Sequence, residues 1–285
     1  MLRLLLALVV ALVSSLLLPL HANVNLLRAT RDPKTNTSRI LLLTAHPDDE
    51  CFFFSPTILA FQEDALRPEI YSLCLSTGNA EGLGEMRRME LGRSLDIMGV
   101  EPDKRWVVDH PLLQDNITMK WDASVIASVI APYVVDNNIT AILTFDAQGI
   151  SSHPNHYSLP LGASCLVHSL SLTRSNTKIV PRVFGLVTVP VLPKYLGIGS
   201  VLFTRLKILL GSSLSYFTSV GISPPMAVFT SGFKEYWTAT RALREHNSQM
   251  LWFRYLYMTF SRYLWVNEWV EIIPTTSTIQ SVNSV

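Results

Sequence analysis

The sequence has 285 residues, of which 48% are hydrophobic and 16% are charged, and its formal net charge is +1. A chain of this length can bury one substantial core, so we expect one globular domain with appendages. The nearly neutral charge, without a basic stripe, argues against nucleic acid as a partner. The three cysteines, Cys51, Cys74 and Cys165, form no CxxC pair, so the sequence indicates neither a disulfide framework nor a thiolate metal site.

Residues 4–20 are uncharged and almost wholly apolar. As a helix this segment would be about 26 Å long, which is marginal against a hydrocarbon core of about 30 Å. The segment fits either a retained anchor or a cleaved signal peptide, and Leu20-His21-Ala22 matches a cleavage site only in part. We assign residues 1–22 to a hydrophobic membrane anchor and residues 23–38 to a polar linker.

Basic residues are distributed unevenly around this apolar segment. One arginine precedes it, whereas Arg28, Arg31, Lys34 and Arg39 follow it. Because basic residues favour the cytosolic side of a membrane, we expect the rest of the chain to face the cytosol.

From residue 39 onward, continuous apolar runs bounded by polar residues alternate with helical patterns. Such runs are typical of strands buried on both faces, and the clearest helical patterns cover residues 85–98 and 123–135. The alternation predicts an α/β fold with a mainly parallel, Rossmann-like sheet flanked by helices. Ligands should bind beyond the carboxyl ends of the strands. The strand-like runs are residues 39–44, 70–76, 106–108, 140–145 and 183–189.

Beyond Pro190 the pattern changes. Residues 195–217 are amphipathic, and residues 252–269 are dense in Trp, Tyr and Phe. Both patterns fit either a membrane interface or core packing, because amphipathicity alone does not distinguish the two. We assign residues 39–270 to one domain whose C-terminal part contacts the membrane, and residues 271–285 to a tail.

Two motifs contain the candidate metal-binding and catalytic residues. His46-Pro47-Asp48-Asp49-Glu50 follows the first strand-like run, and His153-Pro154-Asn155-His156 comes shortly after the run that ends at Phe145. Two strand ends would thus bring imidazoles and carboxylates together, which are ligands that zinc favours. The first motif alone fits a helix-capping turn equally well. The second motif makes a catalytic zinc site, with three protein ligands and an open position for water, the better interpretation.

The motifs at residues 45–50, 144–146 and 152–156 resemble those of the PIG-L/LmbE deacetylases. His246-Asn247-Ser248-Gln249 and Trp252-Phe253-Arg254 resemble the eukaryotic N-acetylglucosaminyl-phosphatidylinositol de-N-acetylase branch. The resemblance covers residues 39–267, so it implies an LmbE-like fold for nearly the whole domain.

The resemblance also implies roles for individual residues. His46, Asp49 and His156 would bind Zn²⁺, and Asp48 would be the general base. His153 would stabilise the oxyanion or protonate the leaving amine. Many bacterial relatives have an aspartate where this chain has Asn155, and an amide cannot raise the pKa of a neighbouring imidazole as a carboxylate would.

Further residues are assigned through the resemblance alone. Arg87 and Asp109 would contact the sugar, although Arg87 also fits a solvated helix position paired with a nearby glutamate. Glu50, Asp146 and Asn155 would orient the ligands, whereas a capping or turn role fits Glu50 and Asp146 as well. No role follows for His246 or His110.

The implied reaction is de-N-acetylation of N-acetylglucosaminyl-phosphatidylinositol at the endoplasmic reticulum membrane. Two alternatives remain: a deacetylase of a soluble N-acetylglucosamine conjugate, and a scaffold protein without turnover. The complete set of motif residues argues against the scaffold, and the aromatic C-terminal region argues against the soluble substrate.

Overall fold

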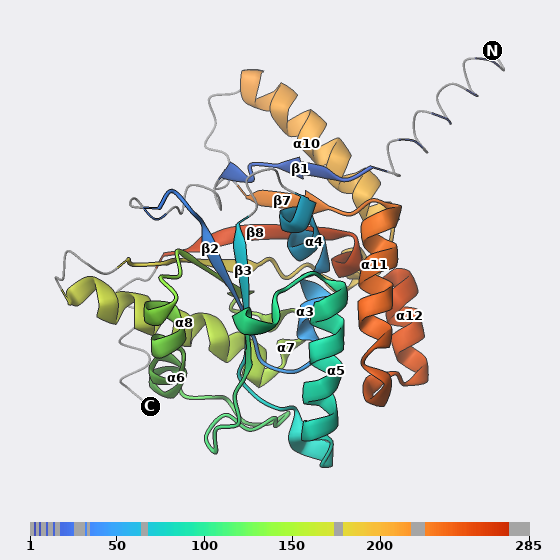
Figure 1. Cartoon of the computed structure of the whole chain (residues 1–285). Coiled ribbons are helices and arrows are strands. Elements are labelled where there is room, and N and C mark those ends of the chain that lie inside the picture. The colour runs from blue at the N-terminus through green and yellow to red at the C-terminus, as the bar shows by residue number, and fades with distance from the viewer. Residues whose placement is uncertain are drawn as a thin grey trace.

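The computed structural model describes residues 18–25, 35–63, 68–173, 179–217 and 226–273, together with Arg3, Leu6, Val10, Ser14 and Asp32. Within these residues, eight strands form one sheet in the order β1-β7-β8-β6-β5-β2-β3-β4 (Figure 1). The strands are β1 (Leu20–Ala22), β2 (Arg39–Thr44), β3 (Glu69–Cys74), β4 (Arg105–Val107), β5 (Ala141–Phe145), β6 (Arg182–Leu186), β7 (Ala227–Thr230) and β8 (Val266–Ile272).

The strands from β2 to β6 form a parallel half-sheet, in which β2 pairs with both β3 and β5. Leu41, Leu43 and Ile142 are completely buried, as expected for strands covered on both faces. The five predicted strand-like runs coincide with β2 to β6, apart from small shifts at their ends. This part of the prediction is confirmed.

The other half of the sheet is antiparallel. β8 pairs with β6 and β7, and β1 pairs with β7 at the sheet edge. The sequence pattern did not predict these three strands, so the mainly parallel sheet is in fact a mixed one.

Two groups of helices flank the sheet (Figure 1). α6 packs on α8, which contacts β2, β5 and β6, whereas α3 and α4 contact β2, β7 and β8 and are joined by α5 and α11. The predicted helices 85–98 and 123–135 correspond to α5 and α6. The helices are α3 (Asp49–Phe53), α4 (Ser55–Glu63), α5 (Gly84–Ile97), α6 (Ala123–Asp136), α7 (Gly149–Ser152), α8 (Pro154–Leu172), α9 (Val191–Lys194), α10 (Gly199–Phe217), α11 (Phe233–Arg244) and α12 (Trp252–Phe260).

The aromatic run at residues 252–269 divides between the core and the surface. Trp269 on β8 is buried and stacks on Phe54, with ring centroids 5.7 Å apart. Trp265 is also buried, whereas Trp252 and Tyr255 on α12 are exposed. Core packing therefore accounts for the second half of the run and leaves the first half unexplained.

None of the helices in the described ranges is both long enough and apolar enough to cross a bilayer. Most of residues 4–20, which were predicted to form an anchor, lie outside the described residues, as does part of the predicted linker. The last residues of the predicted anchor range, Leu20–Ala22, form β1 and pair with β7. At the other end, β8 continues to Ile272, which lies inside the predicted tail.

Candidate functional site

The first motif forms a tight turn at the carboxyl end of β2. Oδ2 of Asp49 accepts hydrogen bonds from the backbone N–H groups of Ala45 and His46, both at 2.9 Å. Asp48 has a φ of 133°, a conformation that a non-glycine residue rarely adopts. The surrounding hydrogen bonds hold this strained residue in place, and strain of this kind concentrates at functional sites.

The second motif follows β5, where Asp146 organises the backbone. Its Oδ1 accepts the N–H of Gly149 at 3.0 Å, and its Oδ2 accepts the N–H of Thr188 at 2.6 Å. Gly149 adopts a φ of 61°, and its carbonyl oxygen lies 3.2 Å from Nδ1 of His156. Asp146 thus orients His156 through the turn that it stabilises. His153 begins α8 as its N-terminal cap.

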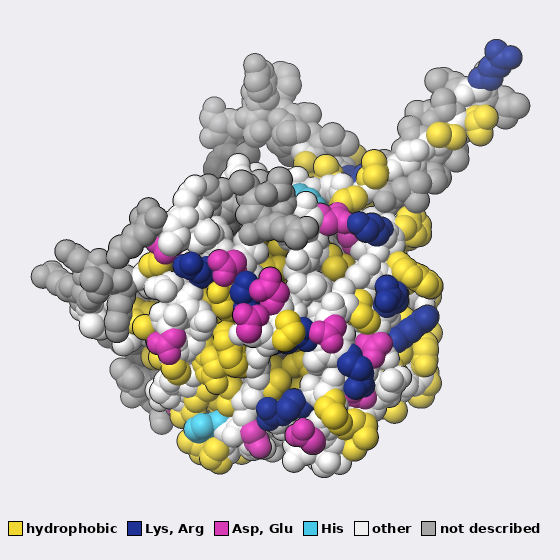
Figure 2. All heavy atoms as spheres, in the orientation of Figure 1, with side chains coloured by type: hydrophobic (Ala, Val, Ile, Leu, Met, Phe, Trp, Pro, Cys, Tyr) yellow, Lys and Arg dark blue, Asp and Glu magenta, His cyan; other side chains and the backbone are white. Residues whose placement is uncertain are grey.

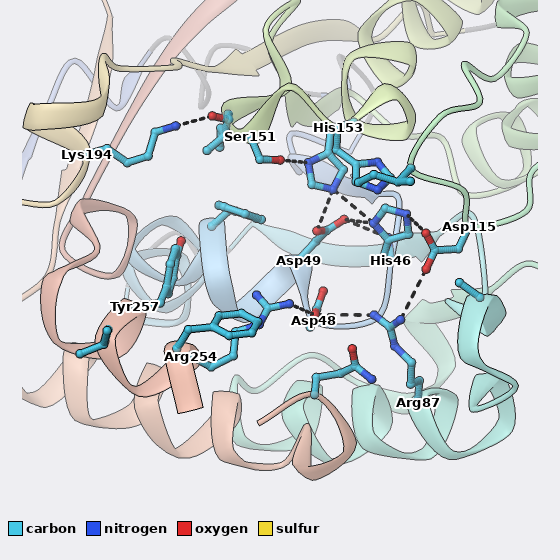
Figure 3. Close-up of a pocket in the computed structure, with 18 of the residues that line it drawn as sticks. His46, Asp48, Asp49, Arg87, Asp115, Ser151, His153, Lys194, Arg254 and Tyr257 are labelled. Atoms are coloured by element: carbon cyan, nitrogen blue, oxygen red, sulfur yellow. Dashed lines mark hydrogen bonds and ion pairs between the residues drawn. The ribbon is translucent and has the colours of Figure 1, made fainter. Parts of the chain in front are cut away.

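The predicted metal ligands from the two motifs converge. Nε2 of His156 lies 3.2 Å from Nδ1 of His46 and 3.2 Å from Oδ1 of Asp49. Ring nitrogens of His46, His153 and His156 lie within 4.8 Å of one another. Figure 3 shows His46, Asp49 and His153 grouped at one end of the site.

Hydrogen bonds fix which atom each ligand presents. Nε2 of His46 lies 3.0 Å from Oδ1 of Asn155 and 3.1 Å from Oδ1 of Asp115. With its proton on Nε2, His46 turns the free lone pair of Nδ1 toward His156. Likewise, Nδ1 of His156 faces the carbonyl oxygen of Gly149, which leaves Nε2 for a metal ion. The N–H groups of the turn bond Oδ2 of Asp49, which leaves its Oδ1 free. Two oriented imidazoles and one carboxylate match the donor set of a catalytic zinc site, so these residues fit a divalent metal ion.

The two neighbouring carboxyl groups have opposite pKa shifts. Burial raises the pKa of Asp48 above its ordinary value, even though Arg254 and Arg87 oppose this effect. Burial would also raise the pKa of Asp49, but the His156 and His46 imidazoles outweigh it and hold that pKa well below its ordinary value. A carboxylate that stays ionised suits a ligand, and one with a raised pKa suits a base.

Asp48 lies between two arginines (Figure 3). Its Oδ2 is 3.6 Å from Nη2 of Arg87 and 3.4 Å from Nη2 of Arg254. Arg87 is buried, and its guanidinium donates to the carbonyl oxygens of Gly78 and Pro47, both at 2.9 Å. Only glycine fits at position 78, because the Cβ of any other residue would lie 2.5 Å from Cζ of Arg87. Arg87 is thus a site residue and not a solvated helix residue.

His153 is half-buried beside the two other histidines. Burial, followed by repulsion from His46 and His156, lowers the pKa of His153 to about 4. At neutral pH its imidazole is therefore uncharged, and it can both donate and accept a hydrogen bond.

Glu50 links the site to His246. Oε2 of Glu50 accepts the backbone N–H of Asp48 at 3.0 Å, while Oε1 lies 2.7 Å from Nε2 of His246 and accepts from Ser94 at 2.6 Å. All three side chains are buried. This geometry supplies the role that the sequence left open for His246, because it holds the glutamate that braces the strained turn at Asp48.

The structure does not bring Asp109 into the site. Its side chain is exposed and accepts a hydrogen bond from Gln114 at 3.2 Å. Asp115 lies there instead, 3.5 Å from Nη1 of Arg87 and in contact with His46. Sequence reasoning missed Asp115, which belongs to no motif, and Arg254, which was noted only as part of a family motif.

These side chains line a cavity of about 1080 Å³. One end carries the histidines and carboxylates, and the rest is largely apolar or cationic. Figure 3 shows Lys194 of α9 with its Nζ directed toward α7, which carries Ser151, and Tyr257 and Arg254 on the same side of Asp48 as Lys194. The other apolar or cationic lining residues include Phe53, Ile117, Ile150, Tyr195, Phe253, Leu256 and Phe260.

Comparison with known proteins gives matches along most of the chain. The family model PIG-L, described as GlcNAc-PI de-N-acetylase, matches residues 41–164. The N-acetylglucosaminyl-phosphatidylinositol de-N-acetylase of Bos taurus is 36% identical, over 81% of this chain and 82% of that protein. A probable enzyme of the same name from Dictyostelium discoideum is 31% identical, over 82% of this chain and 93% of that protein.

Solved structures share the fold at low sequence identity. The N,N'-diacetylchitobiose deacetylase of Pyrococcus horikoshii superposes with a TM-score of 0.54 and 14% identity, covering 88% of this chain and 91% of that one. A deacetylase triple mutant from the teicoplanin biosynthetic pathway also gives a TM-score of 0.54 at 14% identity, covering 84% of this chain and 100% of that one. At such identities the likeness concerns the fold alone.

Proposed function

Since this chain belongs to the PIG-L family of GlcNAc-PI de-N-acetylases, we propose that it removes the acetyl group from N-acetylglucosaminyl-phosphatidylinositol. The products are glucosaminyl-phosphatidylinositol and acetate, and the reaction is an early step of glycosylphosphatidylinositol-anchor biosynthesis. The observation that carries the proposal is the convergence of His46, Asp49 and His156 beside Asp48 in one cavity.

In this proposal His46, Asp49 and His156 hold a Zn²⁺ ion. When bound, zinc polarises the acetamide carbonyl and lowers the pKa of a water ligand from about 15.7 to about 7. The support from this chain is its donor set and the hydrogen bonds that orient each donor.

Asp48 accepts the proton of the attacking water, and its raised pKa suits this task. Arg87 and Arg254 keep its carboxylate in place, and the strained backbone aims it into the cavity. As water adds to the acetamide carbon, His153 donates a hydrogen bond to the developing oxyanion. The C–N bond then breaks, and the proton passes to the departing sugar amine, leaving acetate.

Lys194 offers a contact for the phosphodiester of the substrate. Arg87 and Arg254 are engaged with carboxylates, whereas Lys194 forms no ion pair with a carboxylate in the described part of the chain. The carbonyl oxygen of Ile150 holds its Nζ on the cavity wall, so the sugar would reach the metal ligands while the phosphate meets Lys194.

We also propose that the apolar segment before β1 anchors the protein in the endoplasmic reticulum membrane, with the catalytic domain in the cytosol. The basic excess after the apolar segment supports this orientation. Asn36, Asn116 and Asn138 lie in Asn-x-Ser/Thr sequons, and Asn36 and Asn138 are exposed. All three should stay unmodified, because N-glycosylation is a lumenal reaction. A mobility shift on glycosidase treatment would contradict the orientation.

One assay tests the function directly. Acetate release is measured from N-acetylglucosaminyl-phosphatidylinositol and from free N-acetylglucosamine, in detergent, with and without a chelator. We expect release from the glycolipid that a chelator abolishes. Preference for the free sugar would favour a soluble substrate, and no release from either would favour a scaffold.

A further inference from the structure

An exposed apolar surface surrounds one side of the cavity mouth. On α9, the side chain of Leu192 is 80% exposed, and on α12 that of Trp252 is 76% exposed. The two helices are neighbours, because the N–H of Gly197 donates to the carbonyl oxygen of Phe260 at 2.8 Å. We define the mouth surface by its exposed members Leu192, Tyr195, Trp252, Phe253, Leu256 and Phe260.

This surface continues into the cavity. Tyr195, Phe253, Leu256 and Phe260 are about half exposed, yet each also lines the cavity that contains His46 and Asp48. An apolar group lying on the outside would therefore meet no polar barrier before reaching the wall of the site. Contiguous exposed apolar patches of this kind usually mark a binding surface.

The two segments that carry the mouth surface contain basic residues and no acidic ones. Residues 187–217 and 246–267 have no Asp or Glu, whereas they include Lys194, Arg205, Lys207, Arg254 and Arg262. Of these, Lys207 and Arg262 pair with Glu268, and Arg254 pairs with Asp48, whereas Lys194 forms no ion pair with a carboxylate among the described residues. Elsewhere both signs occur together: on the face drawn in Figure 2, basic and acidic side chains lie side by side. Ion pairs of this mixed kind include Lys104 with Glu69, at 3.5 Å.

We propose that the mouth surface rests on a phospholipid bilayer and that the cavity opens against it. Trp and Tyr favour the membrane interface, and Lys194, which no carboxylate neutralises among the described residues, complements lipid phosphates. This proposal rests on the proposed function, since it explains how a lipid-borne sugar reaches the site. The acyl chains stay in the bilayer while the sugar enters the cavity.

Lys194 lies at the boundary between bilayer and cavity. It follows Leu192 on α9 and precedes Tyr195, and its Nζ donates to the carbonyl oxygen of Ile150 on the cavity wall. If the mouth surface rests on the bilayer, Nζ of Lys194 lies at the level of the lipid phosphates. The mouth surface and the phosphate contact thus belong to one docking geometry.

Tryptophan quenching by brominated lipid tests the contact without any need for turnover. None of the six tryptophans lies in residues 1–17, so the apolar N-terminal segment contributes no signal. The full chain is reconstituted in vesicles of brominated phosphatidylcholine. Trp252→Phe is compared with Trp237→Phe, because Trp237 on α11 is also exposed, at 60%, but does not belong to the mouth surface.

We expect brominated lipid to quench the wild-type protein, with most of the quenching lost in Trp252→Phe and retained in Trp237→Phe. Absence of quenching, or equal loss in both variants, would overturn the proposal. Quenching that depends on Trp252 in a protein without deacetylase activity would uphold the mouth surface and contradict the proposed function.

A second experiment compares two leucine-to-glutamate variants. Leu192→Glu places a charge on the mouth surface, and Leu172→Glu makes the same change at an exposed position, 68% accessible, at the end of α8. The ratio of turnover on vesicle-embedded substrate to turnover on a short-chain, detergent-dispersed substrate should fall about tenfold in Leu192→Glu, the scale set by burying one leucine. The ratio should not change in Leu172→Glu. Equal ratios in the two variants would contradict the proposal.

Discussion

Nη2 of Arg254 lies 3.4 Å from Oδ2 of Asp48, although 206 residues separate them in the sequence. The guanidinium also lies over the ring of Phe52, with its Cζ 4.3 Å from the ring centroid. Helix α12 thus delivers a fixed cation to the residue that we propose as the general base.

Replacing Arg254 by Ala should therefore change the pH dependence of catalysis. Burial raises the pKa of Asp48, and Arg254 contributes the strongest of the opposing charges, so its removal raises that pKa further. Because a base must be ionised, the acidic limb of the kcat/KM profile should move to higher pH. Arg254→Lys keeps the charge and should move the limb less. A limb that stays in place in Arg254→Ala would refute the coupling.

Substitutions at the adjacent carboxylates should separate base from ligand. Asp48→Asn should retain its metal but lose about 100-fold to 10,000-fold in kcat, the range typical of general-base catalysis. Asp49→Asn should lose metal and activity together, as should His156→Ala. Metal content is measured alongside rate. If Asp48→Asn lost the metal while Asp49→Asn kept it, the two roles would be reversed.

Asn155 should affect metal affinity without being a ligand. Its Oδ1 faces Nε2 of His46 at 3.0 Å, so Asn155→Ala removes one of the two acceptors that orient this imidazole and leaves Asp115. Loss of such a contact typically costs about 10-fold to 100-fold in metal affinity. Asn155→Asp keeps an acceptor and should retain most of the affinity. Competition with a chelator measures the effect, and equal affinity in Asn155→Ala and the wild type would refute it.

Lys194→Met should weaken recognition of the phosphate selectively. Losing one charge-assisted hydrogen bond corresponds to about 10-fold in KM for the phosphatidylinositol substrate. A glycolipid that carries N-acetylglucosamine without a phosphate should show the same KM with both proteins. Comparable increases in KM for both substrates would argue for a general structural role instead.

His246→Ala should destabilise the fold. It would leave Glu50 buried without its main partner, and breaking a buried pair from one side costs about 3–5 kcal/mol. The control is His168→Ala, because His168 is half-buried and no buried ion pair involves it among the described residues. Chemical denaturation of the metal-free protein provides the free energies of unfolding. Equal values for the two variants would contradict this role.

The same pair makes stability depend on pH. Burial opposes the charge on His246, but Glu50 outweighs it and raises the pKa of His246 above 6.5. The contribution of His246 to the free energy of unfolding is complete below pH 6.5 and is lost as the pH rises through the raised pKa of His246. Burial likewise opposes ionisation of Glu50, but His246 lowers its pKa below 4.5, so this contribution is lost only as the pH falls through the lowered value.

Sequence patterns predicted the parallel half of the fold because its strands are uniformly apolar. β8 escaped prediction because polar residues interrupt it. Asn267 is buried in that strand and accepts hydrogen bonds from the N–H and hydroxyl groups of Thr57, and Glu268 is paired with Arg262 at 2.6 Å. Tertiary partners satisfy these polar groups, and no local pattern reveals such partners.

The candidate site was likewise predicted from the sequence only in part. His46, Asp49 and His156 belong to short motifs at strand ends, and the structure brings them together as predicted. Asp115 and Arg254 reach the cavity from a loop and from a distant helix, so their positions depend on the path of the chain between elements. The family resemblance suggested Asp109 for the sugar, whereas the chain carries Asp115 into the cavity instead.

The pairing of β1 with β7 bears on how the protein can be cut for expression. A truncation at residue 22 follows the sequence boundary of the apolar segment, but it removes the strand that covers β7. The backbone N–H and C=O groups of Ala227–Thr230 would then form a bare, mostly apolar sheet edge, which is a template for pairing with a second copy. Self-association of such a fragment would reflect this lost edge strand and not the properties of the intact protein. A cut before Leu18 keeps the edge covered.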